Sequence, residues 1–165
     1  MRIKRRIYHN LLPSTMWDRL IQDLDTLLDV SDHPVTTLAN SAAFLFRNLE
    51  RINWLGFYLC DANELYLGPF GGKPACTKIE MGKGVCGTSA LRKETIVVDE
   101  VEKFPGHIAC DPDSRSEIVI PLLSANGELF GVLDVDSAEL SRFGNEEKAM
   151  LEMAAAIIAR KLRTV

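Results

Sequence analysis

The 165-residue sequence has no long apolar run and little positive charge. A membrane-spanning helix needs about 18 or more apolar residues in succession, and no segment approaches that length. The net charge is -4, whereas a nucleic-acid surface needs clustered positive charge to neutralise phosphates. No hydrophobic leader with a small-residue cleavage site follows the N-terminus. We therefore expect a cytoplasmic protein that binds neither membranes nor nucleic acids.

Positive charge gathers at the N-terminus. Four basic residues precede Asp18, the first acidic one: Arg2, Lys4, Arg5 and Arg6. This stretch lacks the Ser-rich, repeatedly basic pattern of a transit peptide. Since the length suits one hydrophobic core, we expect a single domain over residues 1–165, with residues 1–13 as a basic extension.

Cysteine is scarce, with four residues in the chain. Three stand in distinct local contexts: Pro74-Ala75-Cys76, Gly84-Val85-Cys86-Gly87-Thr88 and Gly106-His107-Ile108-Ala109-Cys110-Asp111. In a reducing compartment such thiols more often act in catalysis or as ligands than as structural bridges. They lack the paired C-x-x-C spacing of common zinc folds, so we expect no metal site, although His107 lies near Cys110. The fourth, Cys60, is expected to be buried and inert.

Hydrophobic periodicity and turn residues divide the chain into helices and strands. Helical spacing predicts helices over 17–28, 34–49, 85–92 and from a cap at Asn145 to 162. Ser14 and Thr15 are candidate caps of the first helix. β-Branched and aromatic runs predict strands over 52–60, 65–67, 76–81, 95–98, 117–123 and 129–136. The Asn126-Gly127 pair predicts a hairpin between the last two strands. The predicted fold is α+β, with a largely antiparallel sheet of about six strands flanked by helices.

Gly82-Lys83-Gly84-Val85-Cys86-Gly87 matches the G-x-G-x-x-G pattern of dinucleotide sites. That site needs a parallel strand–helix–strand unit to direct a helix N-terminus at the pyrophosphate. Short turns join the strands here, so a tight turn is the better interpretation. Its backbone amides could polarise a group above them, and Cys86 is the candidate for that group.

Two further patterns depend on the two-residue period of strands. Trp54 and Tyr58 fall on one face of the first strand, together with Cys60 unless a bulge at Gly56 intervenes. Asp134 and Asp136 share a face of the last strand, and Glu117 begins its neighbour. Three converging carboxyl groups repel one another, so they need an ammonium group, a metal ion or a retained proton.

Together these motifs resemble the free methionine-(R)-sulfoxide reductases, which are enzymes with a GAF fold. The similarity runs from about Leu38 to Arg160. It rests on Asn53-Trp54-Leu55-Gly56-Phe57-Tyr58, Leu67-Gly68-Pro69-Phe70, Ala75-Cys76, Gly82 to Thr88, Phe104 to Asp111, Ser116-Glu117-Ile118-Val119 and Gly131 to Ser137.

The resemblance implies a role for each matching residue. Cys110 corresponds to the nucleophile, Cys76 to the resolving cysteine and Cys86 to a further cysteine able to form an alternative disulfide. The aromatic wall around the substrate methyl group corresponds to Trp54 and Tyr58. The acidic set that holds and polarises the substrate corresponds to Glu117, Asp134 and Asp136.

The expected reaction is thiol-dependent reduction of free L-methionine-(R)-sulfoxide without a cofactor. It would pass through a cysteine sulfenic acid and an intramolecular disulfide that thioredoxin recycles. Either a monomer or a homodimer is compatible with the sequence. The R configuration rests on the resemblance alone.

Two non-catalytic alternatives remain. GAF domains also serve as ligand-binding sensory modules, and a thiol redox sensor could switch through Cys76 and Cys110 without turnover. A sensor would form a disulfide with an oxidant but would not convert methionine sulfoxide.

Overall fold

The computed structural model describes residues 15–162, so the predicted cap Ser14 and the basic extension lie outside the described residues. Four α-helices and six strands follow in chain order, with a short 3-10 turn η1 (Val101–Lys103) before β5. Their bounds are α1 (Met16–Leu27), α2 (Pro34–Asn48), β1 (Trp54–Asp61), β2 (Glu64–Gly71), β3 (Lys78–Glu80), α3 (Gly84–Arg92), β4 (Ile96–Val98), β5 (Ser116–Leu123), β6 (Leu129–Ser137) and α4 (Asn145–Lys161). None of the described helices is long and apolar enough to cross a membrane.

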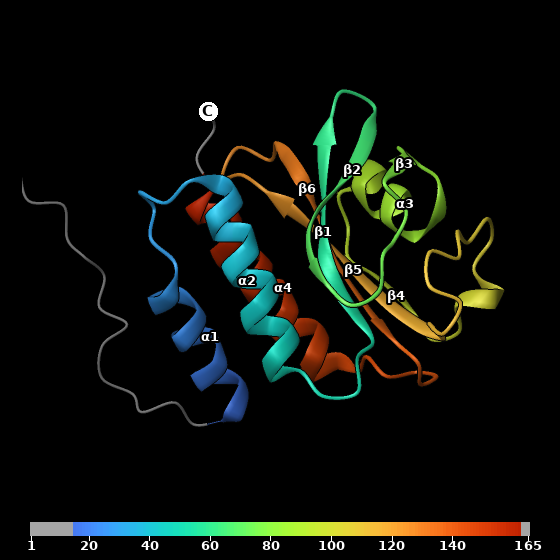
Figure 1. The fold of residues 1–165 in the computed structure, drawn as a ribbon, viewed down its shortest axis with the longest axis horizontal. Helices are drawn as coiled ribbons and strands as arrows, with labels where there is room; N and C mark the ends of the chain where they lie inside the picture. The colour runs from blue at the N-terminus through green and yellow to red at the C-terminus, as the bar shows by residue number, and fades with distance from the viewer. Residues whose placement is uncertain (1–14, 163–165) are drawn as a thin grey trace, which may run out of the picture.

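The six strands form one sheet in the order β3-β2-β1-β6-β5-β4. All five neighbouring pairs are antiparallel, which confirms the predicted sheet. Helices α2 and α4 pack on one face and α1 packs on α4, whereas α3 covers the other face (Figure 1). The sheet is therefore the middle layer between two different helical layers.

The two layers enclose separate apolar clusters. The larger lies under α1, α2 and α4 and contains Leu55, Phe57, Leu133 and Val135. The smaller lies under α3 and contains Trp54, Tyr58, Val132 and Cys86. Because successive strand residues point to opposite faces, β1 and β6 each contribute side chains to both clusters.

Local sequence explains where the first two helices begin. The Thr15 hydroxyl accepts a hydrogen bond from the Asp18 amide at 3.1 Å, and the Asp18 carboxylate accepts one from the Thr15 amide. This reciprocal capping box satisfies two amides that the helix leaves unpaired. Pro34 occupies the first turn of α2, where its missing N–H has no consequence.

The start of α4 differs from the prediction. Gly144 occupies the cap position and Asn145 is already helical, with no side-chain cap. Glu147 in the first turn binds Arg142 at 2.8 Å. Negative charge at a helix N-terminus is favourable, so acidic residues stabilise this end in place of a cap.

Two strands have lengths that differ from the sequence prediction. β2 continues through Pro69 to Gly71, because β3 pairs only with the Glu64–Tyr66 part of it. The Leu67 amide still donates to the Thr77 carbonyl at 3.0 Å, but β3 does not extend to Pro69, so proline is tolerated there. β3 begins at Lys78 rather than at Cys76, which leaves Cys76 in the preceding loop.

Candidate active site

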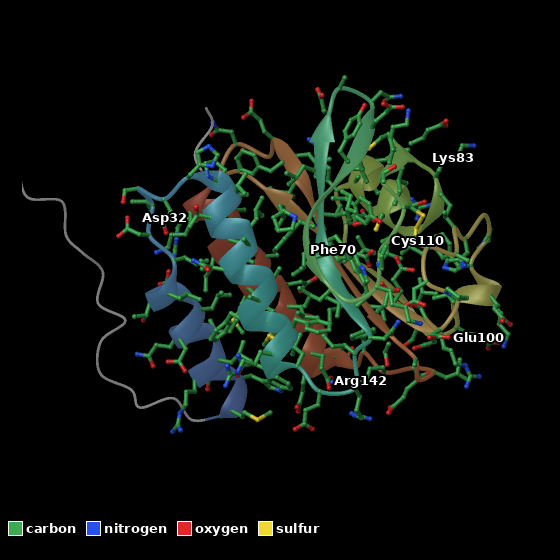
Figure 2. All side chains as sticks on the ribbon, in the orientation of Figure 1. Asp32, Phe70, Lys83, Glu100, Cys110 and Arg142 are labelled. Carbon is green, nitrogen blue, oxygen red and sulfur yellow. A yellow bond between two sulfur atoms is a disulfide. The ribbon has the colours of Figure 1, made fainter. Side chains whose placement is uncertain are left out.

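The site lies on the α3 face of the sheet. A pocket there is lined by Trp54, Tyr58, Ala75, Ile79, Gly84, Val85, Cys86, His107, Ile108, Cys110, Asp111, Ser114, Glu117, Asp134 and Asp136. Seven of the eight residues predicted for catalysis or substrate binding line this pocket. The eighth, Cys76, is bonded to Cys110, which lines it. Figure 2 shows Cys110 on this side of β1, away from α1, α2 and α4.

Cys76 and Cys110 are joined by a disulfide. Cys76 lies in the loop between β2 and β3, and Cys110 lies in the loop before β5; their Cα atoms are 5.3 Å apart. Both residues are half-buried. The loop that is irregular in sequence therefore brings Cys110 to Cys76, which lies 34 residues away along the chain.

Sheet register explains why the three carboxyl groups converge. Glu117 on β5 pairs with Asp136 on β6, and Asp136 pairs in turn with Trp54 on β1. Asp134 lies two residues along β6, beside Gly56. The pleat directs all of these positions to the α3 face.

Gly56 makes room for the aromatic wall. A Cβ atom at this position would lie 2.4 Å from the Phe70 Cβ and 2.6 Å from the Trp54 ring. Because glycine has no side chain, the Trp54 ring extends over this part of the strand. It stacks between Tyr58 and Phe70, with ring centroids 6.0 and 5.5 Å away.

The same aromatic residues hold the loop that carries Cys76. Trp54 Nε1 donates to the Lys73 carbonyl at 3.0 Å, and the Tyr58 hydroxyl donates to the Cys76 carbonyl at 3.0 Å. Burial and the nearby acidic groups raise the pKa of Tyr58, so it stays a neutral donor. The wall of the pocket thus positions the Cys76 loop.

The carboxyl groups are strongly perturbed. Glu117 and Asp134 are only 6% exposed. Burial, followed by the charges of Asp134 and Asp136, raises the pKa of Glu117 well above its usual range. Burial raises the pKa of Asp134 to about 7 and, together with the charge of Asp134, raises that of Asp136. Near neutral pH the cluster retains protons that exposed acids would release.

Cys86 lies deeper in the pocket, on α3. It is buried, and its Sγ atom is 4.0 Å from Glu117 Oε1. Burial, followed by the charges of Asp134 and Glu117, raises the pKa of its thiol well above the ordinary value. The prediction that backbone amides polarise Cys86 is therefore wrong, since desolvation and like charge outweigh the helix N-terminus.

The glycines before Cys86 close a turn. The Gly82 amide donates to the Gly87 carbonyl at 2.8 Å. A Cβ atom at Gly87 would lie 2.3 Å from the Glu80 carbonyl oxygen. Since the neighbouring strands are antiparallel, the turn lacks the unit that a dinucleotide site needs; its glycines instead let α3 approach β3.

Cys60 lies apart from this chemistry. It packs beside the same apolar cluster as Trp54 and Tyr58, as strand alternation predicted. It is half-buried rather than fully buried, because it stands near the end of β1. It does not line the pocket.

Sequence reasoning did not place several residues at the pocket, including His107, which it considered only as a possible metal ligand. His107 Nε2 lies 3.9 Å from Glu117 Oε2, and burial lowers the pKa of the imidazole. Its position three residues before Cys110 was the available signal. Asn53 donates to the Asp111 carboxylate and to the Ser114 hydroxyl at 3.0 Å each. Nothing in local sequence indicates those contacts, because more than 50 residues separate the partners.

Lys73 links the two cysteine loops. Its ammonium group lies 3.5 Å from the carboxylate of Asp111 and also pairs with Asp113. Asp111 directly follows Cys110, and Lys73 lies three residues before Cys76. The ion pairs therefore join the segments that the disulfide joins.

Comparisons with known proteins agree with this geometry. The sequence matches the GAF domain over residues 15–162. It is 43% identical over 145 residues to the free methionine-R-sulfoxide reductase of Escherichia coli, covering 88% of this chain and 87% of that protein. The chain belongs to the free methionine-R-sulfoxide reductases, a GAF-fold family of oxidoreductases.

Two further relatives extend the comparison. The Saccharomyces cerevisiae free methionine-R-sulfoxide reductase is 41% identical over 156 residues, which cover 90% of this chain and 87% of that protein. The solved structure of the Neisseria meningitidis enzyme in complex with its substrate is 39% identical, with a TM-score of 0.82, over 93% of this chain and 95% of that one. The predicted GAF fold is thereby confirmed.

Proposed function

We propose that this protein reduces free L-methionine-(R)-sulfoxide to L-methionine. One observation carries the proposal: a Cys76–Cys110 disulfide borders a pocket that combines three carboxyl groups with an aromatic wall. Its relatives from Escherichia coli and Saccharomyces cerevisiae are named for this activity. The names of these relatives are the basis for proposing the R epimer and the free amino acid as the substrate.

The carboxyl groups suit the charged end of a free amino acid. No Lys or Arg among residues 15–162 forms an ion pair with Glu117, Asp134 or Asp136. An ammonium group entering the pocket would offset their mutual repulsion. The nitrogen of a peptide-bound methionine sulfoxide is a neutral amide, so it would leave the acidic groups without a cation. Asp134 and Asp136 are the proposed ammonium partners.

Cys110 is the proposed nucleophile. Its thiolate attacks the sulfoxide sulfur while Glu117, whose raised pKa keeps its carboxyl group protonated, gives that proton to the oxygen. The attack forms a bond between the two sulfur atoms. The hydroxyl group then passes from the substrate sulfur to the Cys110 sulfur, the sulfur–sulfur bond breaks, methionine leaves and Cys110 becomes a sulfenic acid. Trp54 and Tyr58 would enclose the methyl group.

The resolving step uses Cys76. Its thiolate attacks the Cys110 sulfenic acid, water leaves and the disulfide forms. Cys86 is the further cysteine that could form an alternative disulfide, although burial keeps its thiol protonated. An external dithiol such as thioredoxin then returns both cysteines to thiols, consuming two electrons per methionine sulfoxide.

Single-turnover chemistry tests the proposal. Pre-reduced protein should form about one methionine per chain from the R epimer, and less from the S epimer or from an N-acetylated substrate. Cys110→Ser should form none. Cys76→Ser should keep the first turnover but lose rapid disulfide formation. A reduced wild type that forms disulfide with peroxide yet no methionine would instead identify a redox sensor.

A further inference from the structure

The innermost part of the pocket contains donor groups that the proposed reaction uses only in part. The Cys86 Sγ atom, one carboxylate oxygen of Glu117 and one of Asp134 all lie within 4.8 Å of one another. All three residues are buried. Cys86 comes from α3, whereas Glu117 and Asp134 come from neighbouring strands, so the fold holds the three donors around one point.

A second observation points to a cation-binding site. The Oδ1 atom of Asp134 is buried and has no hydrogen-bond partner among the described residues. Asp134 is only 6% exposed and lines the pocket. A buried acceptor without a partner is costly, and no Lys or Arg among residues 15–162 forms an ion pair with Glu117 or Asp134. A positive ion between the three donors would bring positive charge to the Asp134 carboxyl group and offset its repulsion from Glu117.

The donor set selects the kind of ion. The set offers one thiol and two carboxyl groups, which release their protons when they bind a metal, and His107 Nε2 lies 3.9 Å from Glu117 Oε2 as a candidate fourth ligand. Zinc combines sulfur, imidazole and carboxylate ligands in a tetrahedron, with bonds of about 2.0–2.3 Å. Magnesium and calcium prefer oxygen ligands alone. Cys86, Glu117 and Asp134 already lie within 4.8 Å of one another, and a bound ion would draw their ligand atoms closer together.

We propose that Cys86, Glu117 and Asp134 form a binding site for a divalent transition-metal ion, best matched by zinc, at the base of the pocket. This site differs from the cysteine and histidine set considered from the sequence, because Cys76 and Cys110 are bonded to each other. A bound ion would occupy the place of the substrate ammonium group and so inhibit the enzyme. That inhibition rests on the proposed function, whereas the metal site does not.

The disulfide form provides a clean test. In reduced protein the Cys76 and Cys110 thiolates could bind metal themselves, but in oxidised protein only Cys60 and Cys86 remain free. Cobalt(II) serves as the probe, since a cobalt–thiolate bond gives a near-ultraviolet charge-transfer band. Oxidised wild type should show this band with saturation at one cobalt per chain, and zinc should displace the cobalt and remove the band.

Three variants locate the site. Cys86→Ser should abolish the band, whereas the matched control Cys60→Ser, which removes the other free thiol, should retain it. Glu117→Gln keeps the shape of the side chain and should weaken cobalt binding at least about tenfold, the loss that even outer-shell partners cause. No band in oxidised wild type, or a band lost only in Cys60→Ser, would overturn the proposal. Neither result would bear on methionine formation, which is measured separately on reduced protein.

Discussion

The two faces of the sheet differ in the side chains that β6 presents to them. On the face under α1, α2 and α4, β6 presents Leu133 and Val135, both fully buried in an apolar cluster. On the face under α3, the same strand presents Asp134 and Asp136 beside a disulfide-linked pair of loops. Adjacent residues of β6 therefore affect stability differently. Leu133 and Val135 stabilise the fold, whereas Asp134 and Asp136 place buried carboxyl groups on the other face at a cost in stability.

This difference shows which buried side chains stabilise the folded protein and which destabilise it. Burial of apolar side chains is favourable without any specific partner, so the helical face needs only shape and size. Burial of carboxyl groups is unfavourable unless a proton or cation accompanies them. The apolar cluster under α3 and the larger cluster on the opposite face together offset the cost of the buried carboxyl groups.

The largest effect should follow from weakening the apolar face. Leu133→Ala removes a fully buried side chain and should lower the free energy of unfolding by about 2–5 kcal/mol, because a cavity adds to the lost burial. Urea unfolding of the oxidised protein measures this change. Leu91→Ala, on a residue that is 63% exposed, is the control and should have little effect. A similar loss in both variants would contradict the comparison.

Substitution of Asp134, the residue next to Leu133, should raise the free energy of unfolding instead of lowering it. The folded-state pKa of Asp134 is raised to about 7 from 3.8, so the folded protein retains a proton that the unfolded chain releases. Stability is therefore lost as the pH rises through about 7. Asp134→Asn cannot ionise, and it should become more stable than wild type by roughly 1–3 kcal/mol near pH 8.5.

This prediction is checked by urea unfolding near pH 5 and near pH 8.5. The advantage of Asp134→Asn should be clearly larger at the higher pH, because only there must wild type ionise the buried group. Glu128→Gln, which alters an exposed carboxyl group, serves as the matched control. An advantage that does not change with pH would show that Asp134 is not the source of the electrostatic cost.

The smallest effect concerns the contacts between the cysteine loops. Lys73→Met removes two ion pairs of an exposed lysine, one with the buried carboxylate of Asp111 and one with the exposed carboxylate of Asp113. Such pairs are weak, so disulfide formation after the first turnover should slow by roughly two- to fivefold. Formation of methionine should keep its rate, because Lys73 does not line the pocket. Rapid-quench assays of methionine and of free thiols separate the two steps.

The matched control alters a lysine on the other side of Cys76. Lys78→Met breaks an ion pair with Glu64 at 2.7 Å, which joins β3 to β2 rather than the two cysteine loops. It should leave both steps unchanged. An equal slowing in Lys78→Met would mean that general loosening of this segment, not the contact between loops, controls the disulfide.

The sequence alone determined the elements whose signals are local. The capping residue Thr15, Pro34 in the first turn of α2 and the Asn126-Gly127 hairpin follow from the chemistry of a few neighbouring residues. Alternation along β6 placed Asp134 and Asp136 on one face. Motif similarity supplied the family and thereby drew attention to Cys76 and Cys110.

Only the tertiary structure decided the features that need distant segments. The extension of β2 through Pro69 depended on how short β3 is, and the environment of Cys86 depended on acidic groups from two other elements. The contacts of His107, Asn53 and Lys73 likewise join residues far apart in sequence. Propensities and periods are properties of neighbours along the chain, whereas burial, pKa and loop contacts arise from neighbours in space, and these can be assigned only once the chain has folded.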